Sequence, residues 1–338
     1  LEEAIKGVDV SGQFRFRAQD KSNSTMNGTQ YQKANATTGV MEDVTGENNT
    51  DVEIEVGVKV PVTETVTAVF KIDNANDDRD SVTKADVEIE DYYFSYNNNG
   101  LTVNAGQQNI PGRITDGAQG DGVVALTTLG SVTVGAAAFI TNSLTDSNNV
   151  YSALAMGTFG PVSLGAQYAD VIDYGTTYNV TADASIAMVK VGAEYTESER
   201  DANSSDDYST TKAYISGNVG IVSAKLSYAK TGDQGSGSVA QELEAASEAL
   251  LWNVGTSARA DYDAFTIDAS VAVTPAISLR AAYSAGEQGT GTNTDVKETL
   301  GQISYKVAKN LNTYVRYADV EDQGVEYTRG RIEATYSF

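Results

Sequence analysis

The 338-residue chain contains no cysteine and no histidine. Without cysteine it has neither disulfide bonds nor thiolate metal ligands. Without histidine it lacks the commonest general base and metal ligand, and every Ser-His or Cys-His nucleophile. We therefore expect no enzyme, because catalysis by carboxylates alone needs a pair of acids that no motif here brings together.

Proline and tryptophan are scarce, with 4 residues and 1 residue, and no run approaches the roughly 20 apolar residues of a membrane-spanning helix. Acidic residues outnumber basic ones by 46 to 23, which gives a net charge of −23 and argues against a nucleic-acid partner. Glycine and tyrosine are abundant, with 31 and 19 residues. This composition favours strands joined by turns.

The final segment, residues 326–338 (EYTRGRIEATYSF), alternates strictly between two kinds of side chain. Ile332 and Tyr336 share the apolar or small face, whereas Arg329 and Arg331 share the polar face. The alternation runs to an aromatic residue at the end of the chain. A transmembrane β-barrel needs this arrangement, with one face on lipid, the other on water, and an aromatic at the membrane edge.

Similar alternating segments recur along the whole chain, and they are joined by short and longer connections in turn. Counted this way, the sequence predicts an all-β fold: one transmembrane antiparallel β-barrel of about 18 strands over residues 1–338, with short periplasmic turns and longer external loops. Such a barrel is wide enough to leave an aqueous channel. The alternation breaks at Glu90, which predicts a β-bulge. Residues 239–250 (VAQELEAASEAL) predict a short helix in an external loop.

Three segments resemble the major outer-membrane porins of Campylobacter and related bacteria. They are LEEAIKGVDVSGQFRFR (1–17), AGQQNIPGRITDG (105–117) and the terminal IEATYSF. The resemblance implies a homotrimeric general porin of the bacterial outer membrane, surrounded by lipid and lipopolysaccharide, that passes small hydrophilic solutes and ions. It also implies calcium as a candidate bound ion.

The long connection 108–121 (QNIPGRITDGAQGD) combines apolar residues with Arg113, Asp116 and Asp121. The resemblance implies that this loop folds inward, where its charges would set the size limit and charge preference of the lumen. The alternative is an ordinary external loop. By the same resemblance, Asp116 and Asp121 are candidate calcium ligands. The acidic loops 74–80 and 201–207 offer oxygens without the spacing of the helix-loop-helix calcium site.

Charged residues occupy alternate positions on several predicted strands. Because closure of the barrel makes the first and last strands neighbours, five arginines would line one wall of the lumen, with acids beside them and further round. The arginines are Arg15, Arg17, Arg316, Arg329 and Arg331, and the acids are Glu53, Glu55, Glu88 and Glu90. Separated basic and acidic walls would set up a field across the lumen. The alternative is that these charges only pair with one another on a water-filled face.

Together these features predict a passive channel, and the net charge predicts a mild cation preference. The rival hypothesis is a secreted structural or adhesin β-protein of the cell surface, which would have a similar composition. The alternation of connection lengths and the terminal aromatic residue favour the channel.

Overall fold

The computed structural model describes residues 6–35, 39–74, 87–115, 118–144, 148–201, 208–237, 249–289 and 294–338. All regular secondary structure in these ranges is β-strand. None of these residues belongs to a helix long and apolar enough to cross a membrane.

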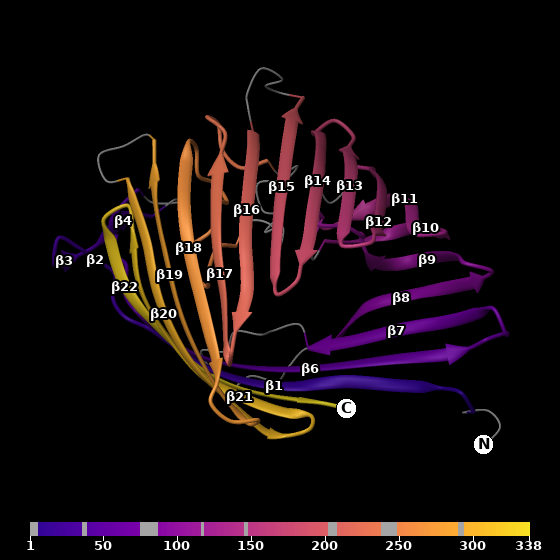
Figure 1. Ribbon diagram of the computed structural model, residues 1–338, viewed down its shortest axis with the longest axis horizontal. Coiled ribbons are helices and arrows are strands. Elements are labelled where there is room, and N and C mark those ends of the chain that lie inside the picture. Colours follow the sequence, from indigo (N-terminus) through magenta and orange to yellow (C-terminus); the bar gives the residue numbers. More distant parts are fainter. Residues whose placement is uncertain are drawn as a thin grey trace.

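The strands form one closed antiparallel barrel, in which β1 pairs with β6 on one side and with β22 on the other (Figure 1). The sheet has 20 strands, and removing the two-residue strands β2 and β3 of the first external loop leaves 18, which confirms the predicted number. The first half of the barrel comprises β1 (Asp9–Lys21), β6 (Glu47–Pro61), β7 (Val66–Asn74), β8 (Val87–Asn98), β9 (Leu101–Asn109), β10 (Gln119–Leu129), β11 (Val132–Asn142), β12 (Val150–Phe159) and β13 (Val162–Val171). The second half comprises β14 (Gly175–Ile186), β15 (Val189–Arg200), β16 (Tyr208–Val219), β17 (Val222–Thr231), β18 (Tyr262–Ala272), β19 (Ile277–Gln288), β20 (Asp295–Ala308), β21 (Leu311–Asp322) and β22 (Val325–Ser337).

The first external loop, between β1 and β6, carries four short strands. They are β2 (Thr25–Met26), β3 (Thr29–Gln30), β4 (Gln32–Ala34) and β5 (Met41–Asp43). Strand β2 extends the barrel edge by pairing with β22, and β4 pairs only with β5 in a separate two-stranded sheet. The sequence predicts no periodic structure in this loop.

The outer surface of the barrel is apolar along the strands. Phe14 and Phe16 of β1 are 45% and 40% exposed, while the arginines between and after them face inward. Other strands show the same pattern, with exposed outward residues such as Phe94, Ile267 and Val315. Exposed apolar side chains in such number suit a lipid surround.

Connections at one end of the barrel are tight. Asn99 and Gly100 join β8 to β9 with φ values of 49° and 83°, the left-handed pair that a two-residue hairpin turn requires. Connections at the other end are mostly longer, but residues 172–174 and 323–324 are also short. The sequence predicts medium loops there, and the difference arises because pairing of β13 with β14 and of β21 with β22 continues to Val171–Gly175 and Asp322–Val325.

Two local predictions have different outcomes. The register of β7 and β8 shifts so that Lys71 faces Asp91 and Ile72 faces Ile89, which leaves Glu90 as the extra residue and confirms the predicted bulge. Most of the predicted helix, residues 239–248, lies outside the described residues, and Ala249 forms an isolated β-bridge with Gly255.

Candidate permeation pathway

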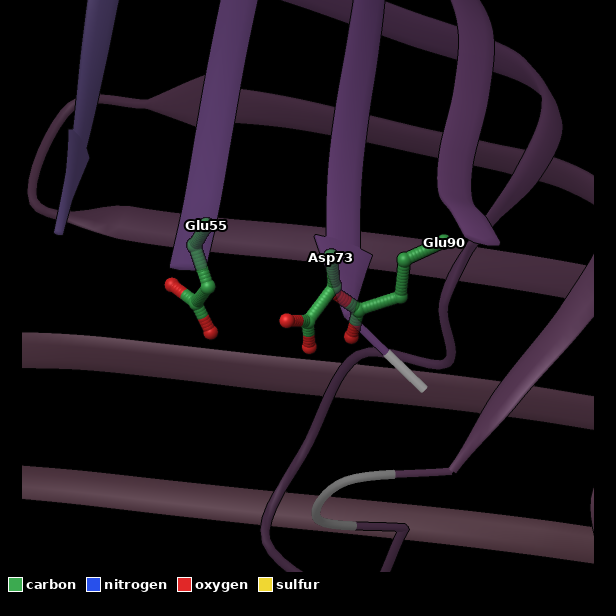
Figure 2. Close-up of side chains that lie close together, drawn as sticks. All are labelled: Glu55, Asp73 and Glu90. Carbon is green, nitrogen blue, oxygen red and sulfur yellow. The ribbon is translucent and has the colours of Figure 1, made fainter. Parts of the chain in front are cut away.

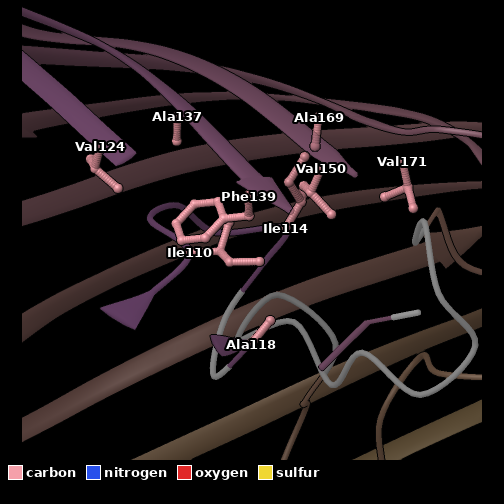
Figure 3. Packing of buried hydrophobic residues seen from close by; sticks show 9 residues of the cluster. All are labelled: Ile110, Ile114, Ala118, Val124, Ala137, Phe139, Val150, Ala169 and Val171. Atoms are coloured by element: carbon pink, nitrogen blue, oxygen red, sulfur yellow. The ribbon is translucent and has the colours of Figure 1, made fainter. Parts of the chain in front are cut away.

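Residues 110–115 and 118, here named the first inward loop, belong to the connection between β9 and β10 and lie against the inner wall of the barrel. Ile110 and Ile114 are only 2% and 1% exposed, and they pack beside the ring of Phe139 (Figure 3). The wall beneath them is apolar and consists of inward-facing residues of β10 to β13: Val124, Ala137, Phe139, Val150, Ala169 and Val171. Burial of the two isoleucines explains why a polar, glycine-containing loop leaves solvent and docks.

Gln167 of β13 fixes the backbone of the first inward loop. Its Oε1 accepts hydrogen bonds from the backbone N–H groups of Arg113, at 2.7 Å, and Ile114, at 3.3 Å. Its Nε2 donates to the carbonyl of Pro111 at 3.1 Å. Gly112 lies so close to this amide that an added Cβ would overlap it. One side chain therefore satisfies three backbone groups of the loop.

Arg113 extends from the first inward loop to the wall at β15. Its Nε and Nη2 donate to the two carboxylate oxygens of Glu194 at 2.9 and 2.6 Å. This two-point ion pair joins a loop that starts at β9 to β15, so the loop and its arginine cover the inner wall over several strands.

The other two predicted loop charges are not brought to Arg113. Asp116 lies outside the described residues. Asp121 belongs to β10, and alternation places it on the same face as the exposed Val123, opposite the buried Val124. The prediction that Asp121 lines the lumen is therefore wrong, because β10 begins at Gln119 and its alternation turns this side chain outward.

The five predicted arginines share one inner wall. Arg15 and Arg17 of β1 pair with acids on both sides: Arg15 contacts Glu53, and Arg17 lies 2.9 Å from both Asp51 of β6 and Glu333 of β22. Asp51 is 1% exposed, so these charges are tightly enclosed. Arg15 and Arg17 therefore form a compact set of ion pairs with these acids.

The remaining three arginines, Arg316 of β21 and Arg329 and Arg331 of β22, contact amides. Arg331 and Arg329 both donate to Oε1 of Gln19, Arg329 also donates to Asn253 at 3.1 Å, and Arg316 donates to Gln302 at 2.8 Å. A sixth arginine, Arg280 of β19, continues the row, since Arg331 faces Arg316, Arg316 faces Gln302, and Gln302 faces Arg280. We call these six residues the arginine wall: Arg15, Arg17, Arg280, Arg316, Arg329 and Arg331.

Arg280 is not among the five arginines that the sequence analysis predicts to line the lumen, although its position in the sequence indicates that it faces inward. Ser278, Arg280 and Ala282 occupy alternate positions on β19, as the other wall arginines do on their strands. Arg280 pairs with Asp268 of the neighbouring β18, with its Nη2 at 2.6 Å from Oδ2.

Residues 249–261, here named the second inward loop, belong to the connection between β17 and β18. They contact both β16 and the arginine wall. At one end Lys212 of β16 approaches the carbonyl of Ala249 at 3.5 Å. Three residues further along the chain, Trp252 lies against Arg316, Arg329 and Arg331. No periodicity marks this loop, so sequence analysis misses it.

A two-point ion pair closes the second inward loop. Arg259 donates from Nη1 and Nη2 to the two oxygens of Asp322 at 2.9 and 2.8 Å, and from Nε to the carbonyl of Gly255 at 3.0 Å. Burial alone would lower the pKa of Arg259, but the hydrogen bonds and charge of Asp322 outweigh it, and the pKa is raised. The arginine therefore stays charged and holds the loop to the end of β21.

Three carboxylates gather on the other side of β1. Glu55 of β6, Asp73 of β7 and Glu90 of β8 have oxygens within 4.8 Å of one another, and Figure 2 shows them converging from neighbouring strands. We name them the acidic cluster. The ammonium of Lys71 lies 2.5 Å from Glu90 and 3.3 Å from Glu55, so a cation of the chain already neutralises part of this charge.

The four predicted acids lie on β6 and β8. Glu53 and Glu55 are consecutive inward positions of β6, and Glu53 is bound by Arg15 rather than left as part of a separate acidic wall. Glu88 faces Asp73 in register, and Glu90 is the bulged residue. The basic and acidic sectors of the wall are therefore adjacent, since β1 carries Arg15 and Arg17 and pairs with β6, which carries Glu53 and Glu55.

The gap between the two inward loops is a pocket of about 490 Å³. Arg113 of the first loop and Ala249 and Leu250 of the second lie on its border. The wall side of the pocket is charged and carries Asp183, Lys190, Glu194, Lys212 and Lys225. A solute that passes between the loops therefore meets both signs of charge within one narrow space.

A family model described as Gram-negative porin matches residues 2–324, which is most of the chain. The chain belongs to the Gram-negative porins. It is accordingly a passive diffusion channel of the bacterial outer membrane. Its family is known for channels rather than enzymes. This membership favours the channel over the secreted structural or adhesin protein.

Solved porin structures share the fold of this porin. A BenF-like porin from Pseudomonas fluorescens Pf-5 has a TM-score of 0.76 at 13% identity, with 99% of each chain covered. OpdQ of Pseudomonas aeruginosa gives 0.75 at 13% identity over 99% of each chain, and OccAB4 of Acinetobacter baumannii gives 0.73 at 10% identity over 98% of each chain. At such identities the likeness shows the fold alone. No curated protein matches the chain significantly.

Proposed function

We propose that this porin is a general channel for small hydrophilic solutes and ions, with a mild preference for cations. The observation that carries the proposal is the pocket between the two inward loops, whose border carries charged side chains of both signs. Its apolar and aromatic lining residues are Ala193, Ala213, Tyr214, Tyr228, Ala249 and Leu250. The net charge of −23 supports the cation preference, because an acidic mouth concentrates cations.

Selection by charge follows from the two sectors beside β1. The arginine wall and the acidic cluster are neighbours on the inner wall, so their field runs round the wall, transverse to the axis of the lumen. A solute with separated charges gains by aligning with this field as it passes. A simple ion gains less, because each sector also contains counter-charges such as Asp51 and Lys71. The expected ion preference is therefore mild.

The test is the reversal potential of the purified porin in a planar bilayer with a potassium chloride gradient. We expect a small potential of the sign that indicates cation preference, and it should shrink at high salt because screening shortens to about 3 Å at 1 M. A reversal potential of the anion-selective sign would contradict the proposal.

The arginine wall supports a second candidate function, a channel selective for small organic acids. Guanidinium groups bind carboxylates by two parallel hydrogen bonds. One of the similar structures, OpdK of Pseudomonas aeruginosa (TM-score 0.73, 13% identity), was solved with vanillate, a small organic acid. Liposome swelling separates the candidates: a general porin admits a neutral sugar and a benzoate salt of similar size at comparable rates, whereas a selective channel excludes the sugar.

The assembly and surroundings that we propose rest on the resemblance to the Campylobacter porins. They are a homotrimer embedded in lipid and lipopolysaccharide, and conductance steps arriving in threes would test the trimer. On the outer face near the loops, Lys297 pairs with Asp295 and Glu321, a charged rim suited to lipopolysaccharide head groups. Calcium binding is likewise proposed from the resemblance, and calorimetric titration with calcium tests it.

A further inference from the structure

Trp252, the one tryptophan of the chain, lies among three guanidinium groups. The guanidinium carbons of Arg329, Arg331 and Arg316 are 4.7, 4.9 and 5.1 Å from the centroid of its ring. All three distances are within the range of a cation–π contact. The indole therefore covers the part of the arginine wall that Arg316, Arg329 and Arg331 form.

The three guanidiniums repel one another, so their closeness needs an explanation. Arg331 and Arg316 face each other in register, and their edges donate to the amide oxygens of Gln19 and Gln302. Amide oxygens satisfy N–H donors without removing the positive charge. The negative face of the indole then supplies attraction that the amides do not. Glu333 lies 4.0 Å from Nη1 of Arg331, but it also pairs with Arg17 at 2.9 Å. The three arginines therefore keep a net positive character while their surfaces are largely occupied.

A buried carboxylate holds Trp252 in place. Glu298 of β20 is 0% exposed, and its two oxygens accept hydrogen bonds from the backbone N–H of Asn253 at 2.8 Å, the side chain of Asn253 at 3.0 Å and the backbone N–H of Val254 at 3.1 Å. A carboxylate buried without such donors would be strongly unfavourable. Glu298 and the residues next to Trp252 therefore stabilise each other's positions.

We propose that Trp252 is a specificity-determining residue of the channel, which limits the access of anions to Arg316, Arg329 and Arg331, and that Glu298 is its positioning residue. The inference rests on the proposed function as a diffusion channel. Replacing the indole would uncover three guanidiniums in the lumen, and anions would then bind and pass more readily. Replacing Glu298 would release the loop and produce the same change indirectly.

The first test uses the fluorescence of Trp252 in the detergent-solubilised porin, and it requires no conductance. Trp252 is partly exposed, so dissolved quenchers reach it. We expect iodide to quench it roughly tenfold more efficiently than caesium, because a cluster of guanidiniums concentrates anions locally. Equal quenching by the two ions, or stronger quenching by caesium, would overturn the placement of Trp252 among the arginines. If the porin shows the expected quenching in detergent but gives no conductance in a planar bilayer, the result would instead count against the channel function.

The second test compares reversal potentials of three variants under a potassium chloride gradient. Trp252→Leu keeps apolar volume but removes the aromatic face, and we expect a shift toward anion selectivity. Trp252→Phe keeps an aromatic face and should shift less. Glu298→Gln should shift in the same direction as Trp252→Leu and, with Trp252 still present, lower the ratio of iodide to caesium quenching. Wild-type reversal potentials in Trp252→Leu and Glu298→Gln, together with wild-type quenching in Glu298→Gln, would overturn the proposal. Heat-modifiable migration on gels verifies that each barrel has folded.

Discussion

Replacing Gln167 with alanine removes the side chain that holds the first inward loop to β13. The substitution leaves the N–H groups of Arg113 and Ile114 and the carbonyl of Pro111 without these partners. At about 0.5–1.5 kcal/mol net for each hydrogen bond, the loss is roughly 2–4 kcal/mol of docking free energy. That corresponds to a shift of roughly 30- to 700-fold in the equilibrium between docked and undocked loop.

The assay is single-channel recording in a planar bilayer. We expect Gln167→Ala to flicker between two conductance levels and to have a higher mean conductance, because the loop spends more time away from its position across the lumen. The barrel itself should unfold at nearly the wild-type temperature, since its strand ladder does not involve this side chain. Ser152→Ala is the matched control, because its Oγ is 3.4 Å from the same amide and no loop atom depends on it. Wild-type conductance and noise in Gln167→Ala would refute the reasoning.

Three further predictions concern the lumen wall. Glu194→Gln should shift the reversal potential toward anions, because it removes the counter-charge of Arg113; an unchanged potential would show that this ion pair does not face the ion path. Lys71→Met should strengthen the cation preference and make the conductance sensitive to calcium, since it leaves the acidic cluster without its ammonium; insensitivity to calcium would contradict this. Ile114→Ala should weaken docking of the first inward loop by about 2–4 kcal/mol, detected as faster tryptic cleavage after Arg113, and equal cleavage rates would argue against a buried Ile114.

Strand alternation made most of the barrel predictable. The polar and apolar faces of 326–338 match the inner and outer faces of β22, and the break at Glu90 marks the bulge. These signals are local, because the period of two follows from the strand itself. Closure was predictable as well, because arginines occupy alternate positions near both ends of the chain. They would line one wall of the lumen if the first and last strands paired.

The parts that escaped prediction depend on contacts across the lumen. The sequence predicts Asp121 in a loop, but β10 begins three residues earlier than predicted, and its alternation places this side chain on the outer face. The second inward loop has no periodicity, and its place follows from Glu298 and Asp322 on distant strands. One overlooked signal was present: apolar residues at inward positions near the strand ends, such as Val171 and Val296, mark where a loop covers the wall.

Pore size tests the central claim most directly, namely that solutes cross a water-filled lumen narrowed by two inward loops. The measurement is the conductance of the purified porin in a planar bilayer, with neutral polyethylene glycols of increasing size in the bath. The account predicts discrete steps that small polymers reduce and large polymers leave unchanged, with a higher size cutoff in Gln167→Ala. Folded protein that inserts and yields no conductance, or a cutoff that Gln167→Ala does not change, would contradict it.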